Sequence, residues 1–138
     1  MNIVIIEDEM FAAKRLENLI REFDDKTRIV AWLESVSESI EWFRSNPDPD
    51  LIFLDIHLED DLSFAIFDKV TVSSPVVFTT ATDEVAIKAF ITKGIDFLHK
   101  PIVQAELFQI LEKYRESGQT YRKVIGAGFF SDLLNMKN

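Results

Sequence analysis

The chain has 138 residues and a formal charge of -9, because 24 Asp and Glu outnumber 15 Lys and Arg. This length predicts one domain that buries enough surface to be stable without disulfides or structural metals. The absence of cysteine excludes disulfide frameworks, thiolate zinc sites and thiol nucleophiles, and the acidic balance argues against direct binding of nucleic acid.

The sequence contains no apolar run close to the roughly 20 residues that a membrane helix requires. Its N-terminus enters an apolar run at residues 3–6 without a basic leader. We therefore expect a cytoplasmic protein that does not bind membranes.

Five short apolar runs predict strands at residues 3–6, 28–33, 51–54, 75–80 and 95–98. The runs at 3–6 and 51–54 show no alternation of apolar and polar residues, which indicates burial on both faces of a parallel sheet. Helices must then cover both faces. Five strand–helix units of this length predict a doubly wound α/β fold with a five-stranded parallel sheet.

Amphipathic stretches between these runs predict the helices. Helical spacing relates four apolar residues after the first strand, three after the second and four in the last helix: Leu16, Leu19, Ile20, Phe23; Val36, Ile40, Phe43; and Leu107, Ile110, Leu111, Tyr114. The second helix must end before Pro47 and Pro49, because proline cannot continue a helix.

Polar groups follow four of the five predicted strands, and parallel strands bring their carboxyl ends to one edge of the sheet. These groups are Glu7 and Asp8, Asp55, Thr80 and Lys100. Three acids brought together cost several kcal/mol unless a cation joins them. Oxygen ligands with open positions favour Mg²⁺. A carboxylate beside a metal, an ammonium and a hydroxyl can accept a phosphoryl group, and Asp55 is the candidate nucleophile.

This set of residues resembles the receiver domain of bacterial two-component response regulators over residues 1–116. The motifs are the Glu7-Asp8 pair, Asp55, Thr80 followed by Ala81, Phe97, and Lys100 followed by Pro101. The segments around Asp55 and Thr80 are most similar to receivers joined to LytTR-type (LytR/AlgR-like) DNA-binding domains. The resemblance implies a flavodoxin-like three-layer sandwich with a cis bond before Pro101.

The resemblance also implies roles for individual residues. Asp8, Asp55 and the main-chain carbonyl of His57 would ligate Mg²⁺ or Mn²⁺, while Glu7 would act through water. Lys100 would pair with Asp55 at rest and with the phosphoryl group afterwards. Two neighbours of these residues, Ile56 and Ala81, are assigned to the cofactor-binding set.

Phosphorylation would then operate a two-state switch. The hydroxyl of Thr80 would turn toward a phosphoryl oxygen and Phe97 would move inward, changing the surface formed by the fourth helix, the last strand and the last helix. His57 and Thr82, each two residues beyond a site residue, would modulate the rate at which the acyl phosphate hydrolyses.

The function implied is signalling, with no role as a classical enzyme. A sensor histidine kinase would phosphorylate Asp55, small phosphoryl donors could replace it, and slow autodephosphorylation would end the signal. The chain would control its own output domain and thereby transcription. We assign residues 1–117 to the receiver and 118–138 to a linker or C-terminal extension, which either leads to that output domain or docks on the receiver.

Ile87 and Ile91 lie four residues apart on the predicted fourth helix. They form either a surface for homodimerisation on phosphorylation or a wider core stripe. A second open point is the loop with Glu59, Asp60 and Asp61, where many receivers have proline and glycine. Its negative charge would either tighten metal binding or slow phosphoryl donors.

Three other functions fit the sequence less well. A phosphatase of the haloacid-dehalogenase type needs a second aspartate where this chain has His57. A receiver-like module that is never phosphorylated would not need the acids, Thr80 and Lys100 together. A nucleotide-binding flavodoxin-like domain would have a glycine-rich loop after the first strand, but Glu7, Asp8 and Glu9 stand there.

Overall fold

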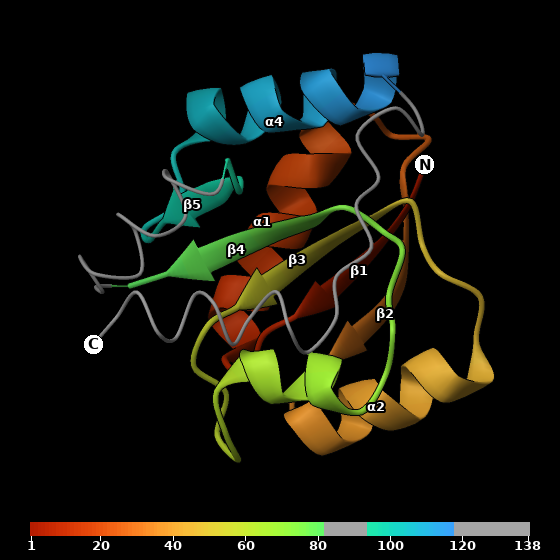
Figure 1. Cartoon of the computed structure of the whole chain (residues 1–138). Coiled ribbons are helices and arrows are strands. Elements are labelled where there is room, and N and C mark those ends of the chain that lie inside the picture. The colour runs from red at the N-terminus through yellow and green to blue at the C-terminus, as the bar shows by residue number, and fades with distance from the viewer. Residues whose placement is uncertain (82–93, 118–138) are drawn as a thin grey trace.

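The computed structural model describes residues 1–81 and 94–117. Its strands are all parallel in the order β2-β1-β3-β4-β5, which confirms the predicted sheet (Figure 1). The elements in chain order are β1 (Asn2–Ile6), α1 (Met10–Phe23), β2 (Arg28–Leu33), α2 (Val36–Ser45), β3 (Leu51–Asp55), η1 (Ser63–Asp68), β4 (Val76–Thr80), β5 (Phe97–His99) and α4 (Gln104–Ser117).

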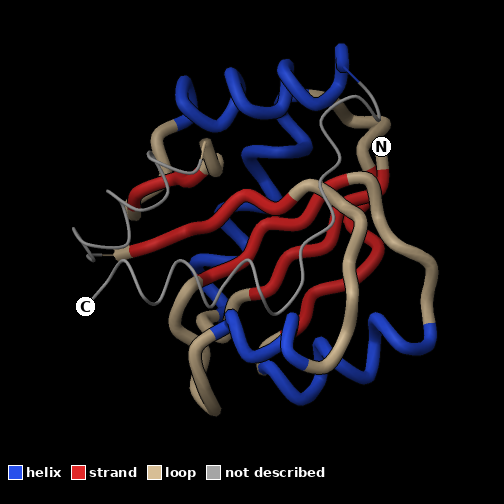
Figure 2. The backbone as a smooth tube through the Cα atoms, viewed as in Figure 1, coloured by secondary structure: helices blue, strands red, loops and turns tan. Residues whose placement is uncertain are grey.

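The helices lie on both faces of the sheet, with α1 and α4 on one face and α2 and η1 on the other (Figure 2). The connection between β3 and β4 departs from the expected strand–helix repeat, because it contains the short 3₁₀-helix η1. Residues three apart share a face in a 3₁₀-helix, so Phe64 and Phe67 are both buried there. The segment between β4 and β5 falls largely on residues 82–93, outside the described part.

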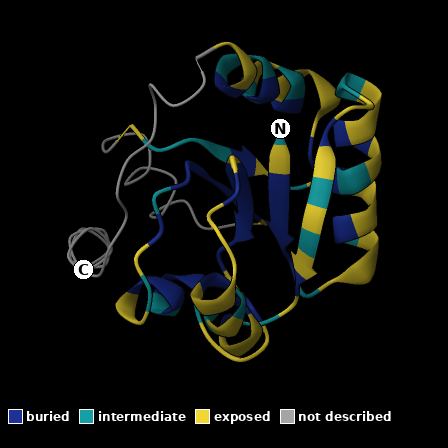
Figure 3. Cartoon of the chain, turned by 90° about the vertical axis from the view of Figure 1, so that its right-hand side faces the viewer, coloured by how far each residue is buried: buried dark blue, intermediate teal, exposed yellow. Residues whose placement is uncertain are grey.

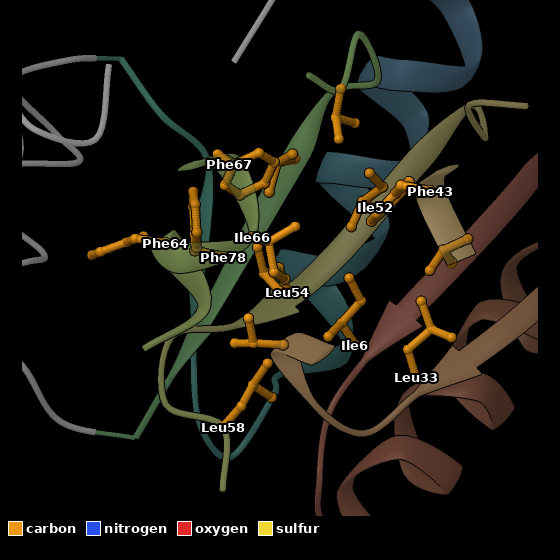
Figure 4. Packing of buried hydrophobic residues seen from close by; sticks show 14 of the residues in the cluster. Ile6, Leu33, Phe43, Ile52, Leu54, Leu58, Phe64, Ile66, Phe67 and Phe78 are labelled. Atoms are coloured by element: carbon orange, nitrogen blue, oxygen red, sulfur yellow. The ribbon is translucent and has the colours of Figure 1, made fainter. Parts of the chain in front are cut away.

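Alternate residues of the central strands enter two separate cores. In β1, Ile3 and Ile5 pack beneath α1 and α4, whereas Val4 and Ile6 face α2 and η1. Figure 4 shows the core on the side of α2 and η1. In this core the rings of Phe64 and Phe78 pack edge to face, with their centroids 5.6 Å apart. Strand β1, next to the N-terminus, is buried over most of its length, while the edge strand β2 is partly exposed (Figure 3).

The predicted helical stripes are largely confirmed. Leu16, Leu19 and Ile20 of α1 are buried, as are Leu107 and Leu111 of α4. Phe23, the last residue of the α1 stripe, is only partly buried, and the centroid of its ring lies 5.3 Å from that of Phe108. Helix α2 ends before the two prolines, as expected.

The start of α2 is fixed by Ser35, whose Oγ accepts a hydrogen bond from the Glu38 amide at 3.0 Å. We expect Ser35→Ala to lower the free energy of unfolding by about 1 kcal/mol, because the amide loses its acceptor. Urea unfolding followed by circular dichroism measures this loss. Ser37→Ala, which changes an exposed serine of the same turn, should stay within about 0.5 kcal/mol of the original chain. Equal stabilities of the two variants would contradict the prediction.

Candidate functional site

The carboxyl ends of four parallel strands bring the predicted site residues to one edge of the sheet. Glu7 and Asp8 follow β1, Asp55 ends β3, Thr80 ends β4 and Lys100 follows β5. Glu7, Asp55 and Thr80 are buried, with exposed fractions of 4%, 7% and 0%. Polar groups are rarely buried without a partner or a use, so this edge is the part of the fold where chemistry is to be expected.

Lys100 lies between the two buried acids. Its ammonium donates hydrogen bonds to Glu7 Oε1 and, at 3.1 Å, to Asp55 Oδ2. The Lys100 amide also donates to the carbonyl of Thr80 at 2.7 Å, and the peptide bond between Lys100 and Pro101 is cis. One cation therefore compensates two carboxylates from different strands.

This arrangement shifts two pKa values. The pKa of Glu7 is raised from 4.5 to about 7, because burial and the neighbouring Asp55 raise it by more than the contact with Lys100 lowers it. Burial lowers the pKa of Lys100, but the hydrogen bond to Glu7 and the charges of both acids outweigh it, so this pKa is above its ordinary value. A second cation at this edge would relieve the repulsion between the carboxylates.

The site also has the donor set that a hard divalent cation requires. Carboxylate oxygens of Glu7, Asp8 and Asp55 all lie within 4.8 Å of one another. Asp8 is the most accessible of the three acids, and the Glu9 amide restrains Glu7 by donating to its Oε2 at 3.3 Å. Oxygen ligands from two strand ends, open to solvent on the Asp8 side, fit Mg²⁺ or Mn²⁺.

Thr80 carries an unused hydrogen-bonding group. Its Oγ1 is buried and has no hydrogen-bond partner, a property shared by the Ser63 hydroxyl among the residues that the structure describes. Leaving such a hydroxyl unpaired costs about 1–3 kcal/mol, so the hydroxyl would gain from an acceptor brought to this edge of the sheet. Phe97 lies on the neighbouring strand β5, partly buried and paired in register with Phe78.

The remaining predicted residues differ in their placement. His57 is exposed, and its amide lies 3.4 Å from Asp55 Oδ1. Ile56 is buried, and its amide donates to the Thr79 carbonyl at 3.1 Å. Ala81 is exposed directly after β4. Thr82, Ile87 and Ile91, together with residues 118–138, fall outside the described residues.

The site is also supported by Trp32, which sequence reasoning missed, and by Asp60, whose effect it left open. The Trp32 indole Nε1 donates to the Glu7 carbonyl at 2.7 Å. Asp60 lies in the loop after β3, residues 57–62, which we call the acceptor loop, and accepts hydrogen bonds from the amides of Val36 and Ser37. The sequence showed that the acceptor loop is negatively charged, but it did not show which groups the Asp60 carboxylate contacts. The Asp60 carboxylate is bonded to the start of α2.

A membrane-spanning helix is absent from the described residues, because none of their helices is both long enough and apolar enough.

Comparisons with known proteins agree with this geometry. Residues 3–112 match the response regulator receiver domain family. The chain is 37% identical over 123 residues to the sensory transduction protein LytT of Enterococcus faecalis and 35% identical over 125 residues to LytR of Streptococcus agalactiae. Each alignment covers 86% of this chain and 50% of the relative, so the chain spans about half the length of these curated relatives.

Solved structures show the same fold. The response regulatory domain of mrkE from Klebsiella pneumoniae superposes with a TM-score of 0.72 at 27% identity, covering 86% of this chain and 98% of that one. A two-component response regulator from Clostridium difficile gives a TM-score of 0.68 at 24% identity, covering 84% of this chain and 96% of that one. Together with the family match over most of its length, these likenesses show that the chain belongs to the receiver domains of response regulators.

Proposed function

We propose that this receiver is a switch in which Asp55 accepts a phosphoryl group from a sensor histidine kinase. The observation that carries the proposal is the position of the Asp55 carboxylate, which ends a buried strand, contacts the Lys100 ammonium at 3.1 Å and lies within 4.8 Å of carboxylate oxygens of Glu7 and Asp8. This is a nucleophile with a fixed cation beside it and a place for a second one.

Transfer of the phosphoryl group from phosphohistidine to Asp55 requires no further reactant. A carboxylate oxygen of Asp55 forms a bond to phosphorus while the bond from phosphorus to the phosphohistidine nitrogen breaks, and the electron pair leaves with the imidazole, which takes a proton. Lys100 remains protonated and stabilises negative charge near the transferred group. Asp8, Asp55 and the carbonyl of His57 would hold Mg²⁺, with Glu7 acting through water, and the ion would neutralise charge on the phosphoryl oxygens. Attack of water on phosphorus later restores the carboxylate and releases phosphate.

The signal would pass through Thr80. Its unpartnered hydroxyl gains an acceptor when a phosphoryl oxygen is present, and this bond favours the state in which Phe97 moves inward. A difference of a few kcal/mol between the states is enough to change which one dominates. The surface that responds would include β5 and α4, and Ile87 and Ile91 would form part of a homodimer on phosphorylation.

The relatives of this chain support an output domain in addition to the receiver. The chain matches about half of each LytT and LytR protein, so we place an output domain beyond residues 118–138, which act as the linker from the receiver at 1–117. Transcription regulation in the cytoplasm, through a LytTR-type output domain, is the role that these names support. This chain itself would not contact DNA, because its charge is -9.

Intact-mass spectrometry tests the proposal. Incubation with acetyl phosphate and Mg²⁺ is expected to add one phosphoryl group, a gain of about 80 Da. Hydroxylamine should remove the group, because it cleaves acyl phosphates, and EDTA should prevent its addition. No gain with acetyl phosphate, phosphoramidate or a purified histidine kinase would overturn the proposal.

A further inference from the structure

The acceptor loop is joined to α2 by the carboxylate of Asp60. Its Oδ1 accepts a hydrogen bond from the Val36 amide at 2.9 Å, and its Oδ2 accepts one from the Ser37 amide at 3.1 Å. The first amides of a helix have no acceptor within the helix, so these bonds satisfy groups that would otherwise need water. Asp60 thus connects two segments that lie more than 20 residues apart in the sequence.

Local hydrogen bonds make the acceptor loop one closed turn. The Leu58 amide donates to the Asp61 carbonyl at 3.1 Å, the Leu62 amide donates to Asp61 Oδ1 at 2.7 Å, and His57 and Leu62 form an isolated antiparallel bridge. A turn closed in this way transmits restraint from its tip to its base. Asp60 is at the tip, and His57 is at the base beside Asp55.

The charge of Asp60 strengthens the connection. Loss of some of its hydration raises the pKa of Asp60, but the hydrogen bonds from the Val36 and Ser37 amides outweigh this effect and hold the pKa below its ordinary value. The carboxylate is therefore ionised at neutral pH. A negative charge at a helix N-terminus is further stabilised by the helix dipole.

We propose that Asp60 is a positioning residue for the cation site. By tying the tip of the acceptor loop to α2, Asp60 fixes the main chain of His57 next to Asp55. Its carboxylate contacts the amides of α2. The inference rests on the proposed function, in which the His57 carbonyl is a metal ligand. Removing a direct hydrogen-bond partner of a metal ligand commonly weakens metal affinity roughly 10- to 100-fold, and the lower end applies here because Asp60 acts on His57 only through the acceptor loop. We expect a loss of roughly 10-fold for Asp60→Ala, because Leu58 remains buried and still restrains the loop.

Magnesium titrations of the 138-residue chain test this role. The indole N–H signal of Trp32 in two-dimensional NMR is the probe, because that group donates to the Glu7 carbonyl at 2.7 Å. Asp60→Ala is expected to raise the Kd for Mg²⁺ roughly 10-fold. Asp60→Asn, which keeps an oxygen acceptor for one of the two amides, should recover part of the affinity.

Ser35→Ala is the matched control, because it also removes a hydrogen bond at the start of α2, but the partner in that bond is Glu38 of α2 and not a residue of the acceptor loop. It should leave the Kd within about twofold of the original value while lowering stability as Asp60→Ala does. If Asp60→Ala binds Mg²⁺ as well as the original chain, or if Ser35→Ala weakens binding equally, Asp60 is only a helix cap. Absence of Mg²⁺ binding by the original chain would instead overturn the proposed function.

Discussion

An Asp55→Asn variant is expected to gain no phosphoryl group from acetyl phosphate under conditions in which the original chain gains about 80 Da. The amide oxygen of asparagine is a far weaker nucleophile than a carboxylate, and the substitution also removes one ligand of the cation site. The fold should be kept, since asparagine matches aspartate in shape and Lys100 retains its contact with Glu7.

Asp61→Asn is a matched control within the same region. It removes a carboxylate from the acceptor loop while its amide oxygen can still accept the hydrogen bond from Leu62. This variant should be phosphorylated like the original chain. A stable, hydroxylamine-labile adduct on Asp55→Asn would show that another residue is the acceptor, and peptide mapping would identify it.

Lys100→Met is expected to lower the free energy of unfolding by about 3 kcal/mol at pH 8 in EDTA. The substitution leaves two buried carboxylates, Glu7 and Asp55, facing each other without a cation. Breaking a buried ion pair costs about 3–5 kcal/mol, and the lower end applies here because the Lys100 side chain is 20% exposed. Urea unfolding followed by circular dichroism measures the loss.

The loss should be smaller at pH 6 than at pH 8. Glu7 already has its pKa raised to about 7 from 4.5 by burial and by Asp55, and removal of Lys100 takes away the contact that lowers it. The folded state then holds a proton at a pH where the unfolded state has released it, so stability increases as pH falls. Mg²⁺ should also restore stability, because it binds the folded state and supplies the missing positive charge.

Lys113→Met provides the comparison for this experiment. Lys113 pairs with Asp96 at 2.8 Å, but its side chain is 37% exposed, so the loss should stay below about 1 kcal/mol and vary little between pH 6 and pH 8. If Lys100→Met is as stable as the original chain at pH 8, or if neither pH nor Mg²⁺ changes its deficit, the repulsion between Glu7 and Asp55 is not the cause.

The sequence by itself determined the architecture and the composition of the site edge. Uninterrupted apolar runs such as 51–54 require burial on both sides, and helical stripes such as that of Leu107 and Leu111 supply the covering layers. Parallel strands bring their carboxyl ends together, so Glu7, Asp55 and Lys100 were expected at one edge of the sheet from the direction of their strands. Local patterns carry this information because strand and helix periodicities are properties of neighbouring residues.

Only the tertiary structure decided how these groups are partnered. It showed that Lys100 bridges two acids, that Trp32 holds the Glu7 carbonyl, and that the connection after β3 forms a 3₁₀-helix where a regular helix was expected. It also showed that the Asp60 carboxylate accepts hydrogen bonds from the first amides of α2, which the composition of the acceptor loop could not reveal. Each of these contacts joins segments distant in the sequence or depends on packing, and no local pattern records which distant amide a carboxylate will meet.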